Sequence, residues 1–183
     1  MYQWGTRALD VARADLELEK TQRPEEALRG AGFVVLSIST GELDATALDL
    51  EIPGRYGVGQ TVGDTVAPGG LFRSLRNISV VVEIACAMEE YCPDAVLRNL
   101  TNPPTVLTRA VSKATSIRAV GLHHELFSTL GMLSTMFDVP EEAINVRVVG
   151  VNHTICVTDV SVHGRDATGE AFRRFCGGEA REI

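Results

Sequence analysis

The sequence predicts an α/β fold in which a parallel sheet carries helices on its faces. Three short apolar runs, at residues 33–39, 94–100 and 116–122, alternate with stretches whose apolar residues recur at helical spacing. Parallel strands are joined by crossover connections that usually contain a helix, so this alternation favours a parallel sheet. The 183 residues and 45% hydrophobic content suit one domain with a sizeable core, or part of a larger one.

The first half of the chain supplies one of these strands and a long helix. A proline, two glutamates and closing glycines predict a short helix over residues 24–30. The run FVVLSIS is apolar and β-branched, as is typical of a strand buried on both faces. We expect residues 40–70 to form a loop, because Gly, Asp and Pro are frequent there. Residues 71–91 place their apolar side chains in one helical stripe.

The second half continues the alternation and then changes to consecutive strands. DAVLRNL and SIRAVGL are strand candidates, and TNPPTVLTRAVSKA between them predicts a turn that leads into a helix. Another helix is expected from about His124 to Phe137. INVRVVGVNH and TICVTDVSV then predict two strands separated by Asn152 and His153, and HGRD predicts a turn.

Composition argues against several classes of function and location. The net charge of −7 and the absence of a Lys/Arg-rich run argue against a nucleic-acid partner. No apolar stretch reaches the ~18 residues of a membrane span, so no membrane partner is expected. The N-terminal residues are too charged for a secretory signal. None of the four cysteines forms a CxxC pair, so we expect buried or free thiols in a cytoplasmic protein.

Polar residues follow the predicted parallel strands, where ligands of such sheets bind. Residues 37–40, 99–102 and 121–124 lie at strand carboxyl ends, so we expect them along one edge of the sheet. His123 and His124 precede a helix start, which favours neutral imidazole, the form that binds metals. His153 follows another predicted strand. The pattern therefore allows a two-histidine metal site as well as simple capping or packing.

Asn102 and Asp64 are candidates for contact with a ligand at the same edge. Asn102 precedes two prolines, so it is either a turn residue or an amide held rigidly against a sugar hydroxyl or a cofactor. Asp64 is either an ordinary turn carboxylate or a charge directed into the site. The stretch GVGQTVG, residues 57–63, is not a dinucleotide fingerprint, because it follows a Pro/Gly loop and no helix begins at its second glycine.

Five segments in this order resemble glycoside hydrolase family 4, the NAD- and manganese-dependent glycosidases. They are EEALRGAGFVVLSISTG, DLEIPGRYGVGQTVGDTVAPGGLFRSLRNI, CPDAVLRNLTNPP, AVGLHHE and VVGVNH. The resemblance implies a Rossmann-like fold of the lactate/malate dehydrogenase superfamily, truncated at both ends and leading into a partial α+β substrate domain. Residues 1–122 would form a partial NAD-binding domain that lacks its first strand and Gly-rich loop. Residues 123–183 would begin the domain that binds substrate and metal.

The resemblance also implies an activity and two cofactors. In the family, NAD oxidises the sugar C3 hydroxyl, a tyrosine removes the acidified C2 proton, and the aglycone leaves by elimination. The metal polarises the C2 and C3 oxygens. We therefore expect a cytoplasmic homo-oligomer that hydrolyses an α-glycoside with NAD and Mn²⁺ or another divalent metal. The segments are most similar to the branch that acts on unphosphorylated α-glucosides, α-galactosides or α-galacturonides.

The resemblance assigns roles to individual residues of this chain. Asn102, in the Asn-Pro motif, would contact the sugar. His123 stands at the position of a metal-binding cysteine, and His153 at that of the second metal ligand. His124 falls at the proposed proton donor, and Asp64 at the acidic residue that supports the tyrosine base.

A further position concerns the substrate, and two alternatives to the glycosidase stay open. Thr46 stands where members that cleave 6-phosphoglycosides carry an arginine, so a non-phosphorylated substrate is expected. One alternative is an oxidoreductase similar to lactate and malate dehydrogenases, in which His123 and His153 would position a hydroxy acid. Such enzymes need an arginine-rich substrate site, and Arg73 and Arg76 do not make a convincing pair for it. The other is an inactive remnant of a family 4 glycosidase.

Overall fold

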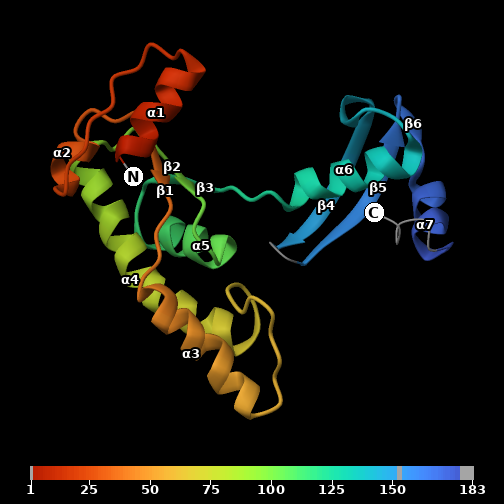
Figure 1. The fold of residues 1–183 in the computed structure, drawn as a ribbon, viewed down its shortest axis with the longest axis horizontal. Helices are drawn as coiled ribbons and strands as arrows, with labels where there is room; N and C mark the ends of the chain where they lie inside the picture. The colour runs from red at the N-terminus through yellow and green to blue at the C-terminus, as the bar shows by residue number, and fades with distance from the viewer. Residues whose placement is uncertain (1, 152–153, 178–183) are drawn as a thin grey trace.

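The computed structural model describes residues 2–151 and 154–177, and it contains two parts, each with its own core (Figure 1). One sheet has the strand order β1-β2-β3 and the other has the order β4-β5-β6. The strands are β1 Phe33–Leu36, β2 Val96–Asn99, β3 Arg118–Gly121, β4 Ile144–Val151, β5 Thr154–Val162 and β6 Arg165–Asp166. The helices are α1 Tyr2–Ala12, α2 Pro24–Leu28, α3 Glu42–Arg55, α4 Ala67–Tyr91, α5 Pro104–Ala114, α6 Glu125–Phe137 and α7 Thr168–Gly177, with a 3-10 turn at Glu141–Ala143.

The first sheet is parallel, as predicted from the alternation of strands and helices. β2 lies between β1 and β3, and Asn99 at its carboxyl end is opposite Leu36 of β1 and Gly121 of β3. All three strands therefore end at the same edge of the sheet. The core beneath this sheet is made by fully buried side chains of β2, α4 and α5: Leu97, Val81, Ala85, Met88, Leu107 and Val111.

β1 is buried on one face only, so the prediction of a strand buried on both faces is wrong. Phe33 and Val35 are each 61% exposed, whereas Leu36 is buried and Val34 packs against the core. On the exposed face the guanidinium of Arg98 lies 4.4 Å from the centre of the Phe33 ring. The exposure extends across the sheet, because Arg98 of β2 and Val120 of β3, which follow Val35 in register, are also exposed. The apolar run indicates a strand, but whether another element covers its second face is a property of the tertiary fold.

Residues 42–55 form the helix α3, where the sequence analysis expected a loop over residues 40–70. Two acidic residues, Glu42 and Asp44, lie in its first turn and favour a helix N-terminus. Pro53 lies near the last turn, so it removes a hydrogen bond close to the end of the helix rather than at its centre. α4 likewise begins at Ala67 instead of residue 71. α1 lies in a region for which no element was predicted.

The second part is built on an antiparallel hairpin of β4 and β5, to which β6 adds a short third strand. The structure contains the two expected strands and the helix up to Phe137. The expected turn HGRD is shorter than predicted, because Arg165–Asp166 form β6. Its core contains Leu133 and Met136 of α6, Ile144 of β4, Val160 of β5 and Ala171 of α7. Figure 1 shows that the segment after β3 leads out of the first sheet to α6. None of the described helices combines the length and apolar composition of a membrane span.

The four cysteines are free thiols, in agreement with the sequence analysis. Cys92, directly after α4, is 5% exposed, and burial raises the pKa of its thiol. A thiol whose pKa is higher in the folded state stabilises the fold at low pH and loses this contribution as pH rises. We therefore expect the free energy of unfolding in urea to decrease from about pH 8.5, the ordinary thiol pKa, towards the higher pKa of the folded state.

Single alanine variants isolate this contribution. Cys92→Ala should remove the thiol-dependent part of the decrease, and Cys86→Ala, which changes an exposed thiol of α4, should leave it in place. Equal pH dependence of both variants would show that Cys92 does not cause the effect.

Candidate functional site

The carboxyl ends of β1 and β2 are joined by buried polar side chains. The Ile38 N–H donates to Thr101 Oγ1 at 2.9 Å, and the Thr101 hydroxyl donates to the Leu36 carbonyl at 3.4 Å. Asn99, which is fully buried, accepts a hydrogen bond from the Thr101 N–H at 2.9 Å and donates to the Thr101 carbonyl at 3.2 Å. These bonds fix the start of the turn that contains Asn102.

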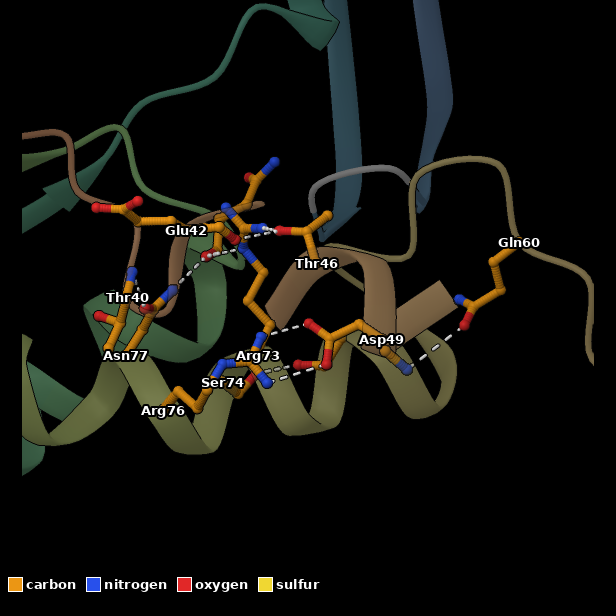
Figure 2. A network of polar contacts seen from close by, with 12 residues as sticks. Thr40, Glu42, Thr46, Asp49, Gln60, Arg73, Ser74, Arg76 and Asn77 are labelled. Atoms are coloured by element: carbon orange, nitrogen blue, oxygen red, sulfur yellow. Dashed lines mark hydrogen bonds and ion pairs between the residues drawn. The ribbon is translucent and has the colours of Figure 1, made fainter. Parts of the chain in front are cut away.

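Asn102 is held through both its backbone and its side chain. Its carbonyl accepts hydrogen bonds from Arg73 Nε at 3.4 Å and from Asn77 Nδ2 at 3.2 Å, and both donors lie on α4. Its side-chain amide donates to Asp64 Oδ2 at 2.5 Å. Asn77 also accepts from the Thr40 N–H at 3.3 Å, so α4 is tied to the segment after β1 (Figure 2). The structure thus brings together Asn102 and Asp64, which the sequence analysis had singled out separately.

Asp64 lies in the loop between α3 and α4. The Thr65 hydroxyl donates to its Oδ1 at 2.9 Å, so each carboxylate oxygen accepts a hydrogen bond. The loop approaches the start of α4 very closely, since a Cβ on Gly69 would lie 2.5 Å from the Gly63 carbonyl oxygen. Residues 57–63 therefore belong to a loop that follows a helix, in agreement with their rejection as a dinucleotide fingerprint.

The adjacent histidines lie between β3 and α6. The Leu122 N–H donates to the Asn99 carbonyl at 2.9 Å, so the chain leaves the sheet beside the carboxyl end of β2. The ring of His123, which is partly buried, stacks on that of His124 with centroids 4.4 Å apart. His124 is exposed, precedes α6 by one residue, and has its Nδ1 3.5 Å from Ser128 Oγ.

A two-histidine metal site at this edge stays a prediction. His153 lies outside the described residues, and among residues 2–151 and 154–177 no three His, Cys, Asp or Glu side chains form a metal-binding group. The donor chemistry of the part that is described fits a metal, because the Nδ1 atom of His123 is buried and imidazole suits first-row divalent ions.

A buried ion pair connects α3 to α4 below this site. Asp49 is almost fully buried, and both of its carboxylate oxygens accept hydrogen bonds from Arg76, one of them from Nη1 at 2.9 Å (Figure 2). The hydrogen bond to Asp49 raises the pKa of Arg76. Of the two arginines considered for a hydroxy-acid substrate, Arg76 is therefore bound to Asp49. Arg73 lies about one helical turn from Arg76 on the same helix.

Sequence reasoning missed Ser74 and Asn77, which lie on the buried side of α4. Both are spaced with Val81, Ala85 and Met88 along one face of the helix. A polar residue on an otherwise apolar stripe needs a hydrogen-bond partner when it is buried. This interruption of the stripe was the signal that could have identified Asn77, whose side chain joins the Asn102 turn to the segment after β1.

A family profile and the sequences of curated proteins both match this chain. A family profile described as family 4 glycosyl hydrolase matches residues 3–139. The alpha-galacturonidase of Thermoanaerobacterium saccharolyticum is 44% identical over 137 residues, 70% of this chain and 30% of that protein. The alpha-galactosidase of Bacillus subtilis is 42% identical over 156 residues, 81% of this chain and 34% of that protein. The chain thus spans about a third of the length of the curated relatives it matches.

Solved structures show the same fold. The lplD protein of Bacillus subtilis has a TM-score of 0.79 and 39% identity, and the match covers 84% of this chain and 37% of that one. The 6-phospho-beta glucosidase of Thermotoga maritima, crystallised with manganese, NAD⁺ and glucose-6-phosphate, has a TM-score of 0.82 at 23% identity, over 93% of this chain and 41% of that one. The lactate dehydrogenase of Eimeria maxima, at 16% identity and a TM-score of 0.67 over 99% of this chain and 51% of that one, shares the fold alone.

Proposed function

Since the chain belongs to family 4 of the glycosyl hydrolases, we propose that it forms the sugar-binding edge of an enzyme that hydrolyses a non-phosphorylated α-glycoside. The contact between Asn102 and Asp64 carries this proposal, because it joins an amide and a carboxylate from distant segments at the carboxyl ends of parallel strands. Similarity to an alpha-galacturonidase and an alpha-galactosidase supports a galactose-type sugar. Thr46 stands where members that cleave 6-phosphoglycosides carry an arginine, which supports a substrate without a phosphate. The Thr46 hydroxyl donates to the Glu42 carbonyl at 3.0 Å.

Each residue of the edge would have its own role. The Asn102 amide would orient a sugar hydroxyl, because its backbone and side chain are both fixed. Asp64 would support the tyrosine base that removes the C2 proton. His124, which is exposed beside the helix start, would donate a proton to the leaving group, because imidazole is a common general acid.

Two cofactors would bind at this edge. His123 and His153 would hold a divalent metal, and imidazole there would favour Mn²⁺ or a related ion. Bound NAD and metal would supply the oxidation at C3 and the polarisation of the sugar oxygens. Support comes from the family assignment and from the Thermotoga structure of the same fold, which contains manganese and NAD⁺.

The test is hydrolysis of a nitrophenyl α-galactoside or α-galacturonide in deuterated water. We expect nitrophenol release that requires both NAD and Mn²⁺, stops when the metal is chelated, and leaves deuterium at C2 of the sugar. Hydrolysis without a nicotinamide cofactor would contradict the proposed mechanism.

A binding measurement tests the metal ligand separately from activity. His123→Gln should weaken Mn²⁺ binding, followed by electron paramagnetic resonance, by about tenfold or more. His163→Gln is the matched control, because His163 is exposed in the turn before β6 and should leave Mn²⁺ affinity unchanged. Equal affinity of the two variants would remove His123 from the metal site.

A further inference from the structure

We propose that Arg73 binds the carboxylate of a uronide, so that the site prefers an α-galacturonide to a neutral α-galactoside. This inference rests on the proposed glycosidase function and names the substrate class of the same site. It follows from a difference between two arginines of α4 that the sequence places three residues apart.

The two arginines differ in their partners. Arg76 donates to both oxygens of the buried Asp49. Arg73 donates instead to neutral oxygens, to Thr46 Oγ1 at 3.4 Å and to the Asn102 carbonyl at 3.4 Å. Within the described part of the chain Arg73 forms no ion pair, although its side chain is partly buried. A partly buried cation without a carboxylate is poorly compensated, and an anionic ligand would correct this.

The donors of Arg73 suit a carboxylate. A guanidinium has five N–H donors, and the two bonds of Arg73 are both at the long end of the hydrogen-bond range. The remaining donors can bind two oxygens side by side, as a carboxylate presents them and a hydroxymethyl group does not. Figure 2 shows the Arg73 side chain extending from α4 towards Thr46 of α3, and the same guanidinium contacts the turn that presents Asn102.

The charge of Asp64 does not cancel this preference. Its two oxygens accept hydrogen bonds from the Asn102 amide and the Thr65 hydroxyl, so the carboxylate lies at the side chain of Asn102. Arg73 lies on the backbone side, at the Asn102 carbonyl. A single guanidinium also matches the one charge of a uronate better than the charge of about −2 on a phosphate, and Arg76 is already bound to Asp49.

The experiment compares the affinities of galacturonate, galactose and galactose 6-phosphate for the 183-residue chain by ligand-observed NMR with NAD and Mn²⁺ present. We expect galacturonate to bind about tenfold or more tightly than galactose. Arg73→Gln should weaken galacturonate binding by about 10- to 100-fold and change galactose binding by less than about twofold. Arg73→Lys, which keeps the charge but loses the planar fork, should give an intermediate loss.

Arg98→Gln serves as the matched control, because Arg98 is exposed on the outer face of β2 and should leave all three affinities unchanged. Circular dichroism confirms that each variant is folded. Equal binding of galacturonate and galactose, preference for the 6-phosphate, or no binding of any sugar would overturn the assignment of Arg73. The two proposals can fail separately. If no deuterium enters at C2 but galacturonate is still preferred and this preference depends on Arg73, the proposed chemistry is wrong and the carboxylate site is retained.

Discussion

Replacing Leu97 by alanine is expected to lower the free energy of unfolding by about 2–5 kcal/mol. Leu97 is 0% exposed, lies in the central strand β2, and belongs to the core formed with α4 and α5. The substitution removes buried methyl groups and leaves a cavity that the neighbouring helices can fill only in part. Loss of this packing loosens the strand whose carboxyl end leads directly into the Asn102 turn.

Urea unfolding followed by circular dichroism measures the effect. Leu43→Ala makes the same chemical change at a residue of α3 that is 84% exposed, so we expect a difference within about 0.5 kcal/mol of zero. Similar losses for the two variants would show that the packing of β2 against α4 and α5 does not dominate stability.

Replacing Asp49 by alanine is expected to cost about 3 kcal/mol, the lower end of the range for breaking a buried ion pair. The substitution leaves the guanidinium of Arg76 without its carboxylate, while 29% of that side chain remains exposed and can be hydrated. The pair is also the main polar connection of α3 to α4, so its loss should weaken the position of Thr46 next to Arg73.

The control for Asp49 is Glu51, two residues further along the same helix. Glu51 pairs with Arg55 at 2.6 Å on the surface, where such i,i+4 pairs contribute about 0.3–0.5 kcal/mol. Glu51→Ala should therefore change the free energy of unfolding by no more than this amount. A double variant that replaces Asp49 with leucine and Arg76 with methionine should recover most of the loss, because it leaves no unpaired charge. An Asp49→Ala variant as stable as Glu51→Ala would contradict a structural role of the pair.

The strands and most helices could be predicted because their signals are local. Hydrophobic periodicity identified α4, and a proline near the first turn indicated α5. The alternation of strands with helices predicted the parallel order of β1, β2 and β3. α3 was missed because its Gly- and Pro-rich surroundings suggested a loop, although the proline lies near the end of the helix. The exposed face of β1 was missed because the composition of a strand does not say whether another element packs on each face of the sheet.

The sequence by itself determined the family and the polar residues at the strand ends, because motif order and periodicity are read along the chain. Only the tertiary structure decided what the two arginines of α4 do. Arg76 meets Asp49, which is 27 residues away, and Arg73 meets Thr46 and the Asn102 turn, which are 27 and 29 residues away. Such contacts depend on how α3, α4 and β2 pack against one another, and helical spacing carries no information about that packing.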